Sequence, residues 1–174
     1  MDARRSLSRR AVLRLLAMAP LALLAGLPAR AATRGPRPVQ LVDDRCPACG
    51  MAVMDARFAA LAVTDGGRTL VYDAVECMAD HRNGHAGPAP SVAEAYLADR
   101  AASSREEAVW CDVDDAVVLH HPRLRTPMGG GLAAFCSDDA ARAFAEAQGY
   151  GEPRLLGWRE VLEVGADRPW VEPR

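Results

Sequence analysis

The stretch FAALAVTDGGRTLVYDAVECMADHRNG, residues 58–84, decides the fold of this 174-residue chain. Its centre, Asp65-Gly66-Gly67, is typical of the tight turn of a β-hairpin, because glycine tolerates the backbone conformations that such turns need. The flanking residues are rich in Ala, Val and Leu, and they predict the two strands of the hairpin. These strands are expected at 58–64 and 68–72.

A helix is expected directly after this hairpin. Asp73 can cap a helix that runs to about Arg82 and ends at Asn83-Gly84. The later stretch LAAFCSDDAARAFAEA, residues 132–147, repeats the order of strand, cap and helix, with Ser137 as the cap. Because each stretch follows another strand, the sequence predicts a small α+β domain of two packed ββα units.

The remaining elements have shorter patterns. A helix is expected from Ser91 to about Ala102, because Val92, Ala95 and Tyr96 recur at helical spacing. The other expected elements are short strands at 108–113 and 116–120, joined at Asp114-Asp115, and a strand followed by a helix within 153–163.

The composition indicates one folded domain that does not bind nucleic acid. Half of the residues are apolar, which is enough for a core that needs no disulfide support. The chain has 21 basic and 23 acidic residues, and six of its arginines but only one acid fall within residues 1–31. The rest of the chain is therefore acidic, whereas a nucleic-acid-binding protein needs a basic surface.

Residues 1–31 have the features of an export signal. The sequence SRRAVLR at 8–14 resembles the twin-arginine motif, an apolar run follows, and Ala29-Arg30-Ala31 gives a small-x-small cleavage pattern. The apolar run is shorter than the roughly 20 residues that span a bilayer. The mature protein is therefore expected in the periplasm. The expected divisions are a twin-arginine signal at 1–31, a linker at 32–42, a folded domain at 43–165 and a C-terminal tail at 166–174.

The segment CPACGM, residues 46–51, carries the clearest chemical signal. One ion can contact both Cys46 and Cys49, but a CxxC pair also occurs in redox disulfides and in zinc sites. A structural zinc site usually has a second close pair of Cys or His, whereas the other cysteines here are scattered singly. A redox CxxC usually opens a helix after a strand, whereas this pair follows a linker. Gly50 stands where c-type haem attachment needs His, which excludes that chemistry.

Two methionines favour copper among these alternatives. Met51 lies two positions after Cys49 across a flexible glycine, so a thiolate and a thioether can chelate one ion. A thioether is a poor ligand for Zn²⁺ and a good one for Cu(I), which prefers soft sulfur. Met128 lies between Pro127 and a run of three glycines, where it either projects into a shared site or fills the loop as a hydrophobic side chain.

The other cysteines have structural interpretations. Cys77 and His81 lie four residues apart and share a face of the expected helix, yet a buried Cys77 and a solvent-facing His81 are favoured over a metal pair. Cys111 and Cys136 fall within expected strands, where packing in the core is the favoured role. Five cysteines leave at least one unpaired thiol in the monomer, and a bound soft metal would protect it.

The order of three segments resembles the NosL family. CPACGM is followed by MDARFAALAVTDGG…LVYDAVECM and then by TPMGGGLAAF before a helix, over residues 43–148. Members of this family are copper accessory proteins that support the assembly of nitrous oxide reductase. The resemblance implies Cu(I) binding, delivery to that reductase with the help of a membrane transporter complex, and a fold similar to the organomercurial lyase core.

The resemblance also implies the metal ligands. By motif, Cys49 and Met51 match the copper ligands of the family, and Met128 matches the methionine of its PMG segment. Cys46 is expected as a transfer ligand or an alternative ligand. Many members are lipoproteins, but no Cys follows the apolar run here, so membrane attachment after signal cleavage is not expected.

The sequence therefore predicts a periplasmic Cu(I) metallochaperone rather than an enzyme. It contains no pattern of a catalytic nucleophile with its base, no phosphate-binding loop and no catalytic carboxylate pair. Two alternatives stay open at this point. One is an enzyme, either a CxxC thiol-disulfide oxidoreductase or an organomercurial-lyase-like protein, and the other is a zinc-structured binding module.

Overall fold

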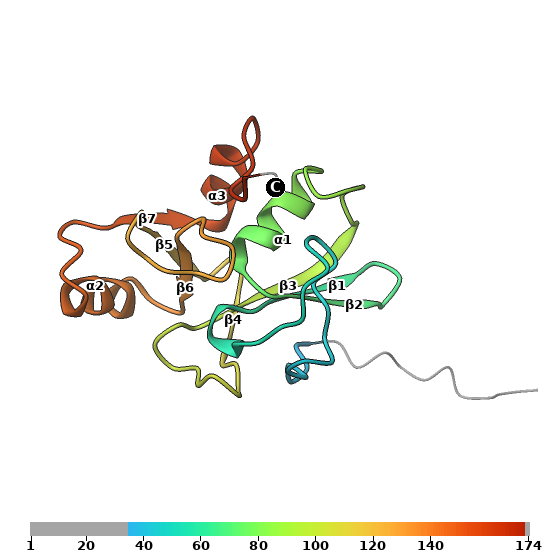
Figure 1. Ribbon diagram of the computed structural model, residues 1–174, viewed down its shortest axis with the longest axis horizontal. Helices are drawn as coiled ribbons and strands as arrows, with labels where there is room; N and C mark the ends of the chain where they lie inside the picture. The colour runs from blue at the N-terminus through green and yellow to red at the C-terminus, as the bar shows by residue number, and fades with distance from the viewer. Residues whose placement is uncertain (1–34, 173–174) are drawn as a thin grey trace, which may run out of the picture. The chain divides into compact units, whose positions relative to one another are not determined.

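The hairpin and helix expected at 58–84 are present in the computed structural model, which describes residues 35–172 (Figure 1). After a short 3-10 turn, η1 (Ala56–Phe58), strand β1 (Ala60–Thr64) pairs antiparallel with β2 (Thr69–Tyr72). Helix α1 (Val75–Arg82) follows and ends at Asn83, as the sequence predicts. The expected export signal, 1–31, lies outside the described residues.

The prediction that Asp73 caps α1 is wrong. The N-cap residue is Ala74, and no side-chain hydrogen bond caps this helix. Asp73 instead turns its carboxylate toward Cys49, whose thiol donates to Asp73 Oδ1 at 3.5 Å. Asp73 therefore contacts the CPACGM segment instead of capping the helix.

The helix expected from Ser91 is a strand. β3 (Val92–Ala98) pairs with β1, and β4 (Trp110–Asp112) pairs with β3, so the first sheet has the order β2-β1-β3-β4. The Ala-rich sequence favours a helix locally, but pairing of residues 92–97 with β1 supplies backbone hydrogen bonds that override this preference.

A second sheet contains the second ββα unit. β5 (Val117–His120) lies between β6 (Leu132–Phe135) and β7 (Arg154–Gly157), and all pairs are antiparallel. Helix α2 (Asp138–Ala147) follows β6, and α3 (Trp158–Val164) follows β7. The segments 108–113 and 116–120 do contain strands, but β4 and β5 lie in different sheets and do not pair with each other.

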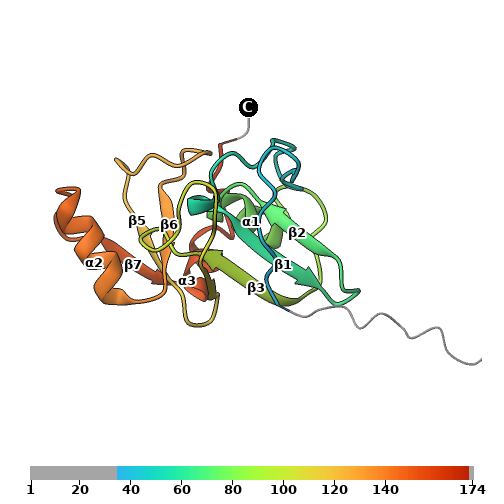
Figure 2. The ribbon, with the colours of Figure 1, turned by 90° about the horizontal axis from the view of Figure 1, so that it is seen from below.

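Helix α1 lies between the two sheets, and it contacts β1 and β2 on one side and β6 on the other (Figure 2). Every residue from Val75 to His81 is buried. Over residues 35–172, the chain is thus a small α+β domain with two antiparallel sheets and three α-helices. The expected likeness to the organomercurial lyase core stays a prediction.

Two links join the sheets beyond α1. Asp99 forms a parallel bridge with Ala134 of β6, and Cys111 of β4 forms a disulfide with Cys136, which follows β6. Cys111 packs in the core as expected, but Cys136 is exposed, and the disulfide between them was not expected. Their sequence positions 25 residues apart gave no sign of a pair, because pairing depends on how the two sheets meet.

Within residues 35–172, no helix is long and apolar enough to cross a membrane.

The cap of α2 supports a test of this fold. Ser137 Oγ accepts a hydrogen bond from Ala140 N at 3.2 Å. We expect Ser137→Ala to lower the free energy of unfolding by about 1 kcal/mol, because one amide of the first turn loses its acceptor. Urea unfolding monitored by circular dichroism measures this loss. Ser137→Asp keeps an acceptor and should stay close to wild type, and an equal loss in both variants would contradict the capping role.

Candidate metal site

The CPACGM segment forms a closed turn. Arg45 and Ala52 bridge its two ends, Cys46 N donates to Met51 O at 2.9 Å, and Gly50 N donates to Cys46 O at 2.8 Å. Gly50 has a φ of 77°, a left-handed conformation that favours glycine. The turn buries Cys46, which is 1% exposed, and leaves Cys49 half-buried at the surface of the domain.

Helix α1 adds a third thiol to this turn. The sulfur atoms of Cys46, Cys49 and Cys77 and one carboxylate oxygen of Asp73 all lie within 4.8 Å of one another. The sequence favoured Cys77 as an inert core residue, and the structure places it in the candidate site. No sequence pattern indicated this, because Cys77 reaches the CPACGM turn only through the packing of α1 beside it.

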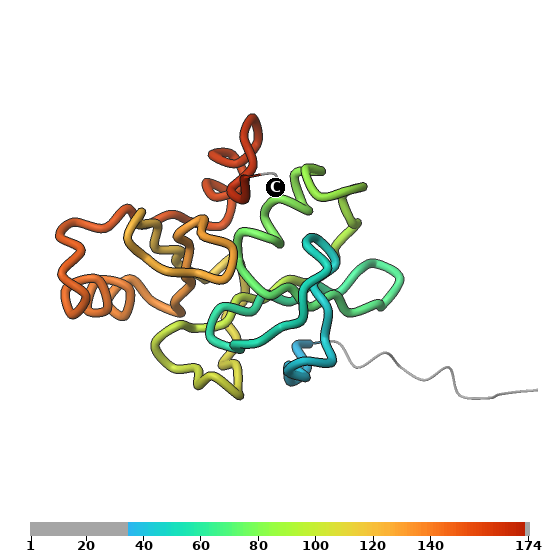
Figure 3. The backbone as a smooth tube through the Cα atoms, in the orientation of Figure 1, coloured from blue at the N-terminus to red at the C-terminus, as the bar shows by residue number. Residues whose placement is uncertain are grey.

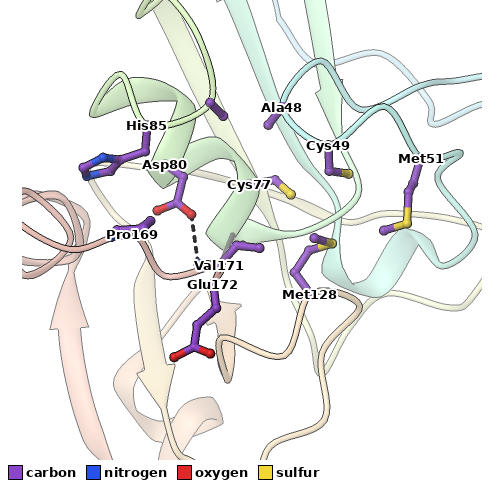
Figure 4. Close-up of a pocket in the computed structure, with 11 residues that line it drawn as sticks. Ala48, Cys49, Met51, Cys77, Asp80, His85, Met128, Pro169, Val171 and Glu172 are labelled. Atoms are coloured by element: carbon purple, nitrogen blue, oxygen red, sulfur yellow. Dashed lines mark hydrogen bonds between the residues drawn. The ribbon is translucent and has the colours of Figure 1, made fainter. Parts of the chain in front are cut away.

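The two predicted methionines face the same space. Cys49, Met51, Cys77 and Met128 line one cavity of about 280 Å³, and Figure 4 shows their sulfur atoms around a common centre. They come from three segments that are distant in sequence, namely the CPACGM turn, helix α1 and the loop before β6. Cys46 lies behind Cys49, within the thiol cluster, and is not among the lining residues.

The C-terminal segment completes the wall of this cavity. Pro169, Val171 and Glu172 line it, and Figure 3 shows this segment returning alongside α1. The carboxylate of Asp80 holds it there, because it accepts hydrogen bonds from Trp170 N at 2.8 Å and Val171 N at 2.9 Å. Residues 169–172 therefore pack beside α1 and the thiols.

The pKa values of Cys49 and Cys77 are raised, which favours their protonated form. Burial raises the pKa of Cys49 to about 12. The hydrogen bond between Cys77 and Cys46, together with burial, raises the pKa of Cys77, and the same hydrogen bond lowers the pKa of Cys46. Because a thiolate is the form that binds metal, a cation that enters this site must displace protons.

Met54, His81, His120 and His121 do not line the cavity. Met54 is 54% exposed and does not line the cavity. His81 is buried rather than solvent-facing, and its Nδ1 pairs with the Tyr72 hydroxyl at 3.1 Å. His120 packs edge-on against Trp170, and His121 stacks on Tyr150.

The donor set defines the class of site. Three thiols and two thioethers are soft ligands, which suit Cu(I) and other thiophilic ions rather than Mg²⁺ or Ca²⁺. A small α+β domain with such a cluster in an open cavity belongs to the class of proteins built to hold a soft metal ion.

Comparison with known proteins agrees with this class. The chain belongs to the NosL family, whose family model matches residues 38–163. This family is not one of enzymes, as the sequence leads us to expect. The crystal structure of the copper chaperone NosL from Shewanella denitrificans has a similar fold, with a TM-score of 0.57 and 18% sequence identity over 75% of this chain and 99% of that chain. No curated protein matches this chain.

Proposed function

We propose that this chain is a periplasmic Cu(I) metallochaperone that supplies copper for the maturation of nitrous oxide reductase, together with a membrane transporter complex. Its membership of the NosL family supports this role, and so does the fold shared with a copper chaperone. The observation that carries the proposal is the convergence of Cys49, Met51 and Met128 on one cavity.

Each ligand has a proposed role. Cys49 is the anchoring thiolate, Met51 chelates the same ion across Gly50, and Met128 supplies a third sulfur from the opposite wall. Cys46 serves as a transfer or alternative ligand, because its thiol lies within the same cluster. Cu(I) accepts two or three soft ligands, so an open site of this kind can release the ion by exchanging one sulfur at a time.

The disulfide supports the proposed compartment. Disulfides persist in oxidising compartments such as the bacterial periplasm and are rare in the cytosol. The Cys111–Cys136 bond therefore fits a protein that leaves the cytosol through the proposed twin-arginine signal. The three thiols near the cavity require protection there, and bound Cu(I) provides it.

Zinc is the second candidate ion, and one observation favours it. Cys46, Cys49, Cys77 and Asp73 form a set of four donors that the sequence did not reveal, and thiolates with a carboxylate also bind Zn²⁺. A zinc-structured module would need the metal in order to fold. It would not need Met51 or Met128, because thioethers are poor zinc ligands.

The enzyme alternatives find less support in the geometry. The nucleophilic cysteine of a thiol oxidoreductase has a lowered pKa, often at a helix N-terminus. Burial here raises the pKa of the more accessible thiol, Cys49, and neither Cys46 nor Cys49 lies at the N-terminus of an α-helix. Insulin reduction and organomercurial protonolysis assays test these activities directly, and turnover that requires Cys46 or Cys49 would overturn the chaperone proposal.

The proposal is tested by anaerobic titration with Cu(I). The mature protein is kept free of added thiol reductant so that the disulfide survives, and it competes with a chromophoric Cu(I) chelator. We expect one tightly bound Cu(I) per chain and weaker competition by Zn²⁺. Transfer of the bound copper to apo nitrous oxide reductase then tests delivery. Tight zinc binding that Cu(I) fails to displace would contradict the copper assignment.

A further inference from the structure

Glu76 is a fully buried carboxylate in the first turn of α1, directly before Cys77. Its Oε1 accepts hydrogen bonds from the Thr126 hydroxyl and from Leu132 N, the latter at 3.2 Å. Its Oε2 has no hydrogen-bond partner among residues 35–172. Both partners of Oε1 belong to the ends of one loop, Thr126–Leu132, and this loop carries Met128.

The loop is folded around the Glu76 side chain. Thr126 Oγ1, which donates to Glu76, accepts hydrogen bonds from Gly129 N at 3.2 Å and from Gly131 N at 3.3 Å. A Cβ at position 130 would lie 2.4 Å from Glu76 Cγ, so the backbone packs directly against the carboxylate side chain. Gly130 therefore allows the loop to pack closely on Glu76, and the hydrogen bonds to Thr126 and Leu132 hold the loop against α1.

Stability alone does not account for an acid at this position. Burying a carboxyl group is unfavourable, and no cation among the hydrogen-bonding partners of Glu76 offsets it. Burial raises the pKa of Glu76. Glu76 is unfavourable to bury, and it holds the Thr126–Leu132 loop through two hydrogen bonds. Its presence is therefore explained by the position that it gives to Met128 in this loop.

The loop presents Met128 to the thiols. Neighbouring residues on an α-helix point about 100° apart, since a turn has 3.6 residues. Cys77 accordingly faces the CPACGM turn, while Glu76 faces the Met128 loop. The first turn of α1 thus connects a thiol ligand and a thioether ligand that come from opposite walls of the cavity.

We propose that Glu76 is a positioning residue for the copper site, which fixes the Met128 thioether at binding distance by holding the Thr126–Leu132 loop. This inference rests on the proposed function, and specifically on Met128 as a ligand. It assigns a role to a residue that does not line the cavity and that no feature of the sequence singled out.

The inference is tested with Glu76→Ala, Glu76→Gln and Met128→Ala in the mature protein. Loss of an outer contact lowers metal affinity by about 10- to 100-fold. We expect Glu76→Ala and Met128→Ala each to lower Cu(I) affinity by about 10-fold, and the double variant to be no weaker than either single variant. Glu76→Gln keeps an oxygen acceptor and should bind nearly as well as wild type.

X-ray absorption at the copper edge provides a readout that a general loss of stability would not change. We expect Glu76→Ala to lose one sulfur from the Cu(I) shell, as Met128→Ala does, and Glu76→Gln to retain it. Thr126→Val removes the same hydroxyl contact without altering α1, and it replaces Glu76→Ala if that variant does not fold. We expect the same loss of sulfur in Thr126→Val.

Asp99→Ala is the matched control. Asp99 is also a buried carboxylate that holds a loop, through Ala101 N and Ala102 N, but it does not line the cavity. Its loss should lower stability and leave Cu(I) affinity unchanged. A wild-type sulfur shell and affinity in Glu76→Ala, or additive losses in the double variant, would overturn the inference. Failure of the wild-type chain to bind Cu(I) would instead contradict the proposed function.

Discussion

Replacing both Cys49 and Met51 with alanine is expected to lower the Cu(I) affinity of this chain by at least about 100-fold, which is the upper range for loss of a mere outer contact. The two residues supply the thiolate and the thioether of one short chelate, and both line the cavity. Removing them leaves Met128 opposite Cys77, whose thiol is buried and carries a raised pKa, together with Cys46, which is buried behind the cavity and does not line it. These two buried thiols and one thioether form a poorer Cu(I) site, because the most accessible thiol and its chelating thioether are gone.

The measurement is competition with a chromophoric Cu(I) chelator under anaerobic conditions. Met54→Ala is the matched control, because Met54 lies three residues from Met51 but is exposed and outside the cavity. That variant should bind Cu(I) as the wild type does. Unchanged affinity in the Cys49→Ala, Met51→Ala variant would show that the copper ligands lie elsewhere, and a loss confined to Met54→Ala would point to the exposed face.

The parts of the fold that the sequence predicts are those that local chemistry determines. The Asp65-Gly66-Gly67 turn sets the β1–β2 hairpin, and Ser137 sets the start of α2. Glycine at the turn and an oxygen at the cap act within a few residues, so the sequence alone contains the relevant interactions. The chelating spacing of Cys49 and Met51 is equally local, and these residues do share a cavity.

The parts that the sequence misses depend on distant partners. The segment 91–102 contains good helix-forming residues, and only its pairing with β1 makes it a strand. Cys77 joins the thiol cluster because α1 packs beside the CPACGM turn, 28 positions away along the chain. The disulfide requires that the end of β6 lie beside β4. None of these long-range contacts leaves a periodic pattern in the sequence.

Helix α1 connects the predicted site residues with those that the sequence did not reveal. This helix is too polar to be recognised as a core element, since Glu76, Asp80 and His81 are all buried in it. Each of the two acids holds one wall of the cavity, Glu76 the Met128 loop and Asp80 the C-terminal segment. The polarity of α1 is therefore explained by the site that it organises rather than by the core that it fills.

Removing the disulfide has the largest expected effect on stability. The bond closes a loop of 25 residues, and the chain-entropy estimate gives a loss of about 3.5 kcal/mol in unfolding free energy for Cys111→Ala with Cys136→Ala. For a domain of this size the corresponding fall in melting temperature is about 10 °C. Replacing both cysteines, rather than one, avoids leaving an additional unpaired thiol.

Thermal unfolding with and without reductant separates this bond from the other cysteines. Wild-type protein should lose stability on reduction, whereas the double variant should not respond, because its remaining thiols, Cys46, Cys49 and Cys77, are already free. Thiol titration of the denatured chain should rise from three to five on reduction of the wild type. An unchanged melting temperature on full reduction would contradict a structural role for the bond. We expect the double variant to retain Cu(I) affinity. This result would show that the disulfide serves stability, whereas the reduced thiol cluster of the same domain serves copper binding.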